Sequence, residues 1–376
     1  MTRSARTAAV VALAALGASC ASIQVASPLT APVQAGPAPA WPLEIAWERN
    51  VEGAMGPGAP LVAGTRLTTG TRRGDIVIVD LEDGRLEGSS SFGDSVEGGV
   101  ALAPGGRRLY VPLATGRRSV VAYDLVAGQR LWGAELGSPV QTRPALVDDS
   151  RVVVASMEGT LAGLEAASGQ VSWTRRPDTT AAFYADPLEV SGGVIAADDR
   201  GRVERVDALD GSVRWTTSVG EPVYNRLAAA GDAVVVPTTR GSLTALDAAT
   251  GRSRWTVALG DRVRVGAPLV AGDVVIAGTS AGEVVAVDLA TGTERWRARV
   301  EGVVSARPAA GRDVVYVGTQ ASRLVALDLT TGDVVWETTL RGRVKSDLAV
   351  AGDLLIVAAE PRHIIALKTE TARAPS

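Results

Sequence analysis

One repeated stretch decides the fold of this chain: ALDAATGRSRW (245–255), AVDLATGTERW (286–296) and ALDLTTGDVVW (326–336). In each copy an Asp is followed four residues later by a Gly, and a Trp follows four residues after that Gly. The same frame recurs in AYDLVAGQRLW (122–132), GLEAASGQVSW (163–173) and RVDALDGSVRW (205–215). An earlier unit, IVDLEDGRLEG (78–88), keeps the turn and has Gly88 where the Trp is expected. A frame repeated along most of a chain indicates a repeat architecture.

Each repeat is about 41 residues long and reads as four short strands. Examples are LVAGDVVIAG (269–278), which is broken at Gly-Asp, and the segments EVVAVD (283–288) and TERWRARV (293–300). The acidic residue of the motif can cap the turn before the fourth strand, and the Gly supplies its left-handed backbone. No long helical period occurs in residues 43–376. Four-stranded units of about 40 to 45 residues are the blades of β-propellers.

The number of repeats predicts how the ring closes. Eight third strands end at Asp80, Asp124, Glu165, Asp207, Asp247, Asp288, Asp328 and Lys368, but the chain ends where the eighth fourth strand would fall. The missing strand is LEIAWERNV (43–51), whose Trp47 lies 41 residues before Gly88. We therefore predict an all-β protein with one domain over 43–376, an eight-bladed propeller whose last blade is completed by the N-terminal strand beside Ile364–Lys368. Sharing one blade between both chain ends leaves no loose terminal repeat.

The rare residues exclude several kinds of chemistry. The chain has one His (His363) and one Cys (Cys20), so it cannot form a Ser-His-Asp triad elsewhere, a His-rich metal site or an intrachain disulfide. Its formal net charge is only −3, which argues against a nucleic-acid-binding surface. We predict no metal ligands and no catalytic residues.

The N-terminus has the pattern of an export signal. Arg3 and Arg6 precede a short apolar run, and small residues lead to Cys20, so residues 1–20 resemble the signal peptide of a bacterial lipoprotein with Cys20 as the lipidated residue. The position three residues before the cysteine is Gly17, where that family usually has Leu, and an ordinary signal peptide is the alternative. Ser22 favours sorting to the outer membrane in a cell that has one. Residues 21–42 are rich in Ala, Pro and Ser and are predicted to be a tether.

The repeat resembles the tryptophan-docking motif of the pyrroloquinoline-quinone (PQQ) propeller superfamily over residues 43–376. An exported lipoprotein made only of this propeller is similar to the BamB family, the lipoprotein subunits of the machinery that folds β-barrels into the outer membrane. The resemblance implies a non-enzymatic scaffold that faces the periplasm, touches the membrane only through its lipid anchor and docks onto the barrel-inserting subunit. It assigns the once-per-blade tryptophans to packing between blades, at Trp47, Trp132, Trp173, Trp215, Trp255, Trp296 and Trp336.

Two other classes remain open at this point. Quinoprotein dehydrogenases share the motif, but they are usually longer, and many place a disulfide of adjacent cysteines over the quinone, which one Cys cannot form. We therefore predict no cofactor. A propeller that senses a small ligand, or binds another protein, would instead present a pocket on its axis without chemistry.

The first strand of each blade lies nearest the axis, so residues that precede it are candidate binding residues. The alignment column before Pro144 and its equivalents holds Ala59, Val100, Arg143, Asp186, Arg226, Ala267, Arg307 and Asp347, with Tyr184, Tyr224, Asn225 and Lys345 beside it. These charges either neutralise one another or form a docking surface for a partner loop. As a docking hypothesis, replacing Arg226 and Arg307 by Ala should abolish partner capture without altering the fold. The segments 178–186 and 113–119 are secondary candidates for contact loops.

Overall fold

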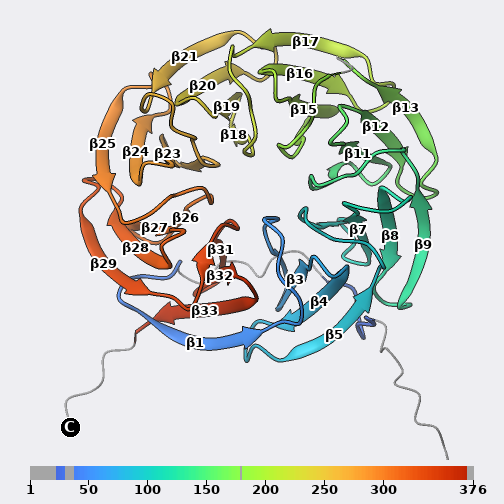
Figure 1. Ribbon diagram of the computed structural model, residues 1–376, viewed down its shortest axis with the longest axis horizontal. Coiled ribbons are helices and arrows are strands. Elements are labelled where there is room, and N and C mark those ends of the chain that lie inside the picture. The colour runs from blue at the N-terminus through green and yellow to red at the C-terminus, as the bar shows by residue number, and fades with distance from the viewer. Residues whose placement is uncertain (1–22, 30–37, 178–179, 371–376) are drawn as a thin grey trace, which may run out of the picture.

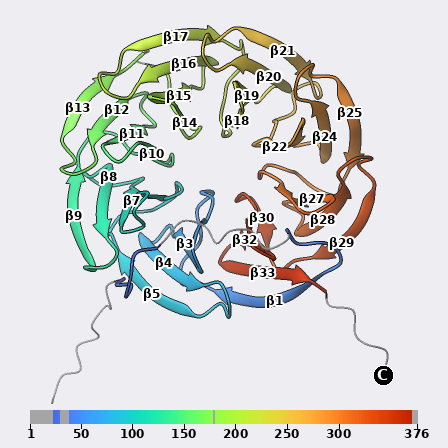
Figure 2. The ribbon, with the colours of Figure 1, turned by 180° about the vertical axis from the view of Figure 1, so that it is seen from behind.

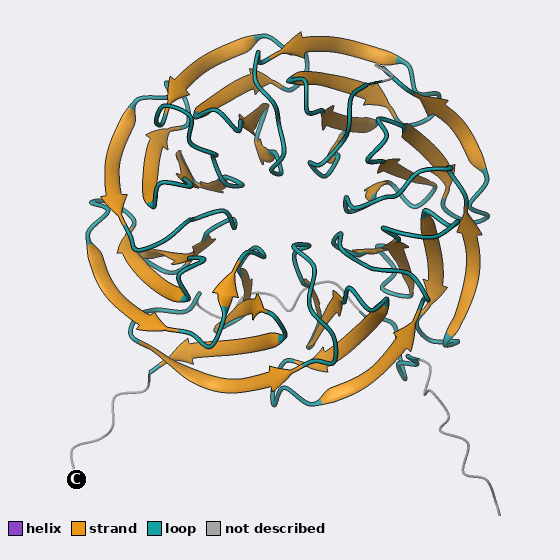
Figure 3. Ribbon diagram, viewed as in Figure 1, coloured by secondary structure: helices purple, strands orange, loops and turns teal. Residues whose placement is uncertain are grey.

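The computed structural model describes residues 23–29, 38–177 and 180–370, so the predicted signal peptide and Cys20 lie outside the described residues. The described residues form strands, turns and loops without a helix (Figure 3). Eight sheets are arranged in a ring around a central axis (Figure 1). The prediction of an eight-bladed propeller is confirmed. No helix in the described part of the chain is long and apolar enough to cross a membrane.

The first four blades each contain four antiparallel strands in sequence order. Blade 1 comprises β2 (Leu61–Ala63), β3 (Arg66–Gly70), β4 (Asp75–Asp80) and β5 (Leu86–Ser91). Blade 2 comprises β6 (Ala101–Leu102), β7 (Arg108–Pro112), β8 (Val120–Asp124) and β9 (Gln129–Ala134). Blade 3 comprises β10 (Ala145–Val147), β11 (Arg151–Ala155), β12 (Leu161–Glu165) and β13 (Val171–Arg175). Blade 4 comprises β14 (Leu188–Val190), β15 (Gly193–Ala197), β16 (Arg202–Asp207) and β17 (Val213–Ser218).

Three further blades repeat this order and the eighth departs from it. Blade 5 comprises β18 (Ala228–Ala230), β19 (Ala233–Pro237), β20 (Ser242–Asp247) and β21 (Ser253–Ala258). Blade 6 comprises β22 (Leu269–Ala271), β23 (Val274–Gly278), β24 (Glu283–Asp288) and β25 (Glu294–Arg299). Blade 7 comprises β26 (Ala309–Ala310), β27 (Val314–Gly318), β28 (Arg323–Asp328) and β29 (Val334–Thr339). Blade 8 comprises β30 (Arg343–Val344), β31 (Ala349–Ala351), β32 (Leu354–Glu360), β33 (His363–Thr369) and β1 (Leu43–Asn50).

Blade 8 joins the two ends of the chain as the repeat count predicts. Strand β1 pairs antiparallel with β33, with Leu43 opposite Thr369 and Asn50 opposite His363. The His363 Nδ1 lies 2.7 Å from the Glu48 Oε1, which adds a side-chain contact between the same two strands. The short strand β30, which pairs with β32, was not predicted.

The apolar core lies mostly between neighbouring blades. The second and third strands are buried along most of their length, whereas an outer strand such as β25 alternates and buries Trp296. The Trp296 Nε1 donates to the Leu329 carbonyl of the next blade at 3.0 Å, and a Cβ at Gly332 would lie only 2.6 Å from the Trp296 ring. Equivalent indole hydrogen bonds to the next blade come from Trp47, Trp132, Trp173, Trp215 and Trp255. Trp336 faces blade 8, whose last two strands are the chain ends and have no such turn.

The antiparallel order gives the ring two different faces. Turns between first and second strands, and between third and fourth strands such as 81–85, lie on one face, which we call the motif face. Turns between second and third strands, and the connections between blades such as 92–100, lie on the opposite face, which we call the connection face. Figure 2 shows the ring from behind.

Parts of the predicted tether pack against the ring. Ile23, Val25 and Leu29 are buried in a core cluster with side chains of blades 1 and 2. At the other end, the Pro39 carbonyl accepts a hydrogen bond from the Tyr316 hydroxyl at 3.2 Å. The described portions of this segment therefore contact the propeller. Their apolar residues are buried against it, which the Ala/Pro/Ser composition alone does not predict.

Candidate functional site

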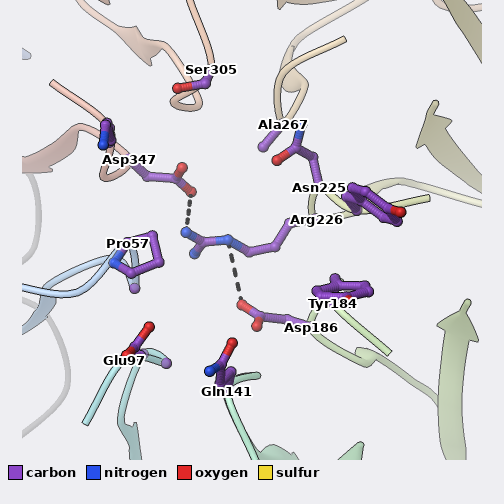
Figure 4. Close-up of a pocket in the computed structure, with 15 residues that line it drawn as sticks. Pro57, Glu97, Gln141, Tyr184, Asp186, Asn225, Arg226, Ala267, Ser305 and Asp347 are labelled. Carbon is purple, nitrogen blue, oxygen red and sulfur yellow. Dashed lines mark ion pairs between the residues drawn. The ribbon is translucent and has the colours of Figure 1, made fainter. Parts of the chain in front are cut away.

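The candidate site is the mouth of the central funnel on the connection face. A cavity of about 280 Å³ opens there between the loops that lead into the first strands. Figure 4 shows side chains from opposite sides of the ring meeting over the axis. The residues that line it are Pro57, Gly58, Glu97, Gly98, Gly99, Gln141, Tyr184, Asp186, Tyr224, Asn225, Arg226, Ala267, Ser305, Lys345 and Asp347.

Arg226 bridges the funnel. It precedes β18 of blade 5, and its Nε lies 3.4 Å from the Asp186 Oδ2 of blade 4 (Figure 4). Its Nη2 lies 3.1 Å from the Asp347 Oδ2 of blade 8, across the axis. The exposed fractions of the three side chains are 22%, 18% and 8%, so the pairs are largely shielded from water. Burial lowers the pKa of the Arg226 guanidinium, but the carboxylates of Asp347 and Asp186 outweigh it and raise that pKa above its ordinary value.

The two aspartates also connect neighbouring blades through their second oxygens. The Asp186 Oδ1 accepts a hydrogen bond from the backbone N–H of Arg143 at 2.7 Å, which joins blades 3 and 4. The Asp347 Oδ1 accepts one from the backbone N–H of Arg307 at 2.9 Å, which joins blades 7 and 8. Each carboxylate therefore has one oxygen on a neighbouring backbone and the other on Arg226. The neutralisation interpretation of these charges accounts for Arg226, Asp186 and Asp347.

The guanidinium groups of Arg143 and Arg307 make fewer polar contacts than that of Arg226. The Arg143 Nη2 donates to the Ala59 carbonyl of blade 1 at 2.9 Å, while its buried Nε has no hydrogen-bond partner among the described residues. Burial, followed by the positive charge of Arg226, lowers the pKa of the Arg143 guanidinium. The Arg307 side chain is exposed, and within residues 23–29, 38–177 and 180–370 no carboxylate lies in salt-bridge distance of its guanidinium.

An aromatic pair forms one edge of the mouth. The rings of Tyr184 and Tyr224 lie 4.7 Å apart at 48°, and the two residues are 41% and 39% exposed. The adjacent Asn225 is held in place because its Nδ2 donates to the Val265 carbonyl at 2.7 Å. Lys345 is less available than the sequence suggests, since its Nζ lies 2.9 Å from the Glu360 Oε2 on β32.

The alignment column found the charged ring but missed part of the lining. Gln141 and Ser305 stand two residues before Arg143 and Arg307, in the same column as Tyr184, Tyr224 and Lys345. Extending the alignment by two residues would have identified both. Glu97 was missed because it lies one residue out of register in the alignment. The Val96 N–H bonds to the Thr71 carbonyl as the Val344 N–H bonds to the Thr319 carbonyl, so Glu97 is the structural equivalent of Lys345.

The secondary candidate loops are partly internal. In the segment 178–186, Phe183 is 1% exposed and its N–H donates to the Ser156 carbonyl of the preceding blade. In the segment 113–119, the Ser119 Oγ donates to the Ser138 carbonyl at 2.8 Å. Residues 178 and 179 lie outside the described residues. In the described part of the chain, no group of three or more His, Cys, Asp or Glu side chains is arranged to hold a metal ion.

One known protein family matches the sequence of this chain over nearly the whole ring. The family described as outer membrane protein assembly factor BamB matches residues 72–226, 199–296 and 280–374. This chain belongs to the BamB family. A BamB relative from Yersinia pestis is 28% identical over 178 residues, which is 43% of this chain and 44% of the relative. One from Pseudomonas aeruginosa is 33% identical over 167 residues, 42% of each chain. The matched regions span less than half the length of these BamB relatives.

Solved structures share the fold. BamB from Moraxella catarrhalis superimposes with a TM-score of 0.74 at 20% identity, over 87% of this chain and all of that one. Quinohemoprotein alcohol dehydrogenase from Comamonas testosteroni does so with a TM-score of 0.69 at 13% identity, over 89% of this chain and 78% of that one. An assembly factor and an enzyme thus share this propeller, so BamB-like function must be argued from the site itself.

Proposed function

We propose that this protein is a non-enzymatic lipoprotein scaffold of the outer membrane, anchored through Cys20 and facing the periplasm. It docks through the funnel mouth onto the barrel-inserting subunit of the outer-membrane assembly machinery. Membership of the BamB family and the printed names of its relatives support the class of function. The observation that carries the docking site is the exposed pair Tyr184 and Tyr224 beside a charged ring that Arg226 bridges.

The charge pairing favours docking over catalysis. A general base or a metal ligand needs a carboxylate that is free to take a proton or an ion. The carboxylates of Asp186 and Asp347 are instead committed to Arg226 and to backbone N–H groups. A cofactor bound on the axis at this mouth would displace the Arg226 guanidinium and leave two shielded carboxylates without their cation, which is strongly unfavourable.

The exposed groups fit a protein partner. Tyrosine and arginine are, with tryptophan, the side chains enriched at the energetic centres of protein interfaces. Tyr184 and Tyr224 supply an aromatic surface, and Arg307 supplies an exposed cation beside it, since its backbone N–H bonds to Asp347 of the cavity lining. We infer a partner segment that carries an apolar side chain for the tyrosine pair and a carboxylate for Arg307.

The docking test uses variants that leave the bridge intact. Tyr184→Ala with Tyr224→Ala, and separately Arg307→Ala, should reduce capture of the barrel-inserting subunit from solubilised envelopes at least tenfold, which corresponds to about 1.4 kcal/mol. Leu209→Ala is the matched control, because Leu209 is 67% exposed in a motif-face turn. Unchanged capture by both mouth variants would reject this face. Arg226→Ala is a poor probe, because it removes the cation from two shielded carboxylates and so perturbs the fold.

A sensing function is the second candidate. The cavity of about 280 Å³ is lined by the Gln141 amide, the Ser305 hydroxyl and the Lys345 ammonium, which would suit a small polar ligand. A ligand that binds there stabilises the folded state, by about 2.7 kcal/mol at a hundredfold excess over its Kd. A screen of small carboxylates and phosphates by thermal shift tests this, with Gln141→Ala as the variant in which the shift should shrink, because Gln141 lines the cavity.

A further inference from the structure

We call the packed interface between the outer strand of one blade and the next blade a joint. The joint between blades 1 and 2 lacks the tryptophan that is present at the other joints. Gly88 on β5 pairs with Ile78, in the same register in which Trp296 pairs with Ala286 on blade 6. The N-terminal segment fills the vacant position, since a Cβ at Gly88 would lie 3.6 Å from the Ile23 Cα. Ile23 is 1% exposed. A side chain of this segment thus provides the apolar bulk that the tryptophan provides elsewhere.

The segment also reproduces the tryptophan's hydrogen bond. At other joints, the indole N–H donates to the carbonyl of the residue that follows the acidic motif residue, for example Leu329 or Leu81. The equivalent residue in blade 2 is Leu125, which follows Asp124. The Leu125 carbonyl accepts a hydrogen bond from the Val25 backbone N–H at 2.8 Å. Both parts of the tryptophan contact are therefore replaced by residues 23–25.

Further contacts hold the segment along the groove. The Ile23 N–H donates to the Ser90 Oγ at 2.7 Å, and its carbonyl accepts from the Tyr123 hydroxyl at 3.0 Å. The Leu29 N–H donates to the Gly106 carbonyl at 2.7 Å. Ile23, Val25 and Leu29 are buried, whereas the intervening Gln24 is exposed. Over residues 23–25 this alternation is that of an extended peptide, and a bend at residues 26 and 27 precedes Leu29.

We propose that residues 23–29 are a built-in docking peptide that replaces the missing tryptophan of blade 1 and fixes the anchored end of the chain to the rim between blades 1 and 2. The replacement rests on the contacts alone, whereas its consequence for the membrane rests on the lipid anchor of the proposed function. Cys20 precedes Ile23 by three residues, and three extended residues span at most about 11 Å. A flexible tether of the length of 21–42 would give a root-mean-square reach of roughly 25 Å.

The docked segment therefore decides which part of the ring lies at the membrane. Leu125 and Gly106 belong to turns of the motif face, and the segment lies at the outer edge of the ring beside β5 and β9 (Figure 1). The funnel mouth opens on the connection face, at the axis. An anchor held at this rim keeps the bilayer at one edge of the propeller and leaves the mouth clear for a protein partner.

Crosslinking tests the docking directly in the full-length exported protein. Ile23→Cys with Gly88→Cys places two thiols close together, and the oxidising compartment should convert most of this variant to an intrachain disulfide. Gln24→Cys with Gly88→Cys is the matched control and should form several-fold less. Equal crosslinking of the two pairs would overturn the proposal. Labelling of the Cys20 thiol is scored separately: a reactive thiol there refutes the lipid anchor of the proposed function without touching the docking.

A second test compares the effect of Gly88→Trp on the Tm with and without a docked segment. Ile23→Asp should release the segment and raise its rate of proteolytic cleavage at least tenfold, whereas Gln24→Asp should leave that rate unchanged. Gly88→Trp should then raise the Tm of the Ile23→Asp protein, because the indole refills the joint and donates to the Leu125 carbonyl. In the otherwise native chain, the same Trp competes with Ile23 and should not raise the Tm. An equal effect of Gly88→Trp in both backgrounds would contradict the replacement.

Discussion

Removing the Arg226 bridge should destabilise the whole ring. In Arg226→Met the side-chain volume is largely kept, but Asp186 and Asp347 lose their shared cation while remaining only 18% and 8% exposed. Breaking a buried ion pair costs about 3 to 5 kcal/mol. The lower end applies here, because each carboxylate keeps a hydrogen bond from a backbone N–H. We expect a loss of about 3 kcal/mol in the free energy of unfolding.

The corresponding shift in Tm follows from the size of the domain. An unfolding entropy near 2.1 cal/mol/K per residue, over roughly 330 residues, converts about 3 kcal/mol into a decrease of about 4 °C. Circular dichroism at 218 nm, a wavelength at which strands absorb, would follow the melt. The control is the triple variant Arg226→Met, Asp186→Asn and Asp347→Asn, which keeps the acceptors and removes the charges, and should recover most of the loss. An Arg226→Met protein with the native Tm, or a triple variant that is no better, would refute the bridge as a stabilising element.

Three further predictions concern the joints and turns between blades. Trp296→Ala should lower the free energy of unfolding by about 3 to 5 kcal/mol in urea denaturation, because the cavity left at the joint is lined by packed side chains and the hydrogen bond to the next blade is lost. Gly332→Ala should lower the Tm more than Gly352→Ala: both have positive φ, but only at Gly332 would the new Cβ meet the Trp296 ring at 2.6 Å, whereas nothing lies within 4 Å at Gly352. The hydrogen bond from Arg295, with those from Thr291, lowers the pKa of the Asp288 carboxyl to about 2. A depressed folded-state pKa gives stability that is present above the unfolded pKa and lost on acidification, so the Tm should fall between about pH 4 and 2, and less steeply in Arg295→Ala; equal slopes would exclude this contact as a source of acid sensitivity.

The fold was accessible from sequence because its signals are local and repeated. The acidic residue, Gly and Trp of each motif act within one turn or between adjacent blades, so six near-complete copies define the repeat without knowledge of the whole ring. The spacing of Trp47 from Gly88 then located the closing strand, and β1 pairs with β33 as expected. The periodicity also predicts that the charged column gathers at one mouth of the funnel, since equivalent positions in a ring face the same axis.

The pairing within the site was not accessible in the same way. Arg226 reaches Asp347 three blades away, and a linear alignment does not say which side chains cross the axis. Lys345 pairs with Glu360 on a neighbouring strand of its own blade, outside the aligned column. The docked segment was missed because its composition indicates a linker, although the alternation of Ile23 and Val25 beside an unfilled motif position, Gly88, was a usable signal.

Photocrosslinking from the funnel mouth in living cells tests the central claim most directly. A photoreactive phenylalanine analogue at Tyr184, which is 41% exposed on the connection face, is compared with the same analogue at Leu209 on the motif face. We predict that irradiation joins the Tyr184 position to the barrel-inserting subunit and leaves the Leu209 position without that adduct. Adducts to that subunit from Leu209 alone, or adducts from neither position, would contradict docking through this mouth.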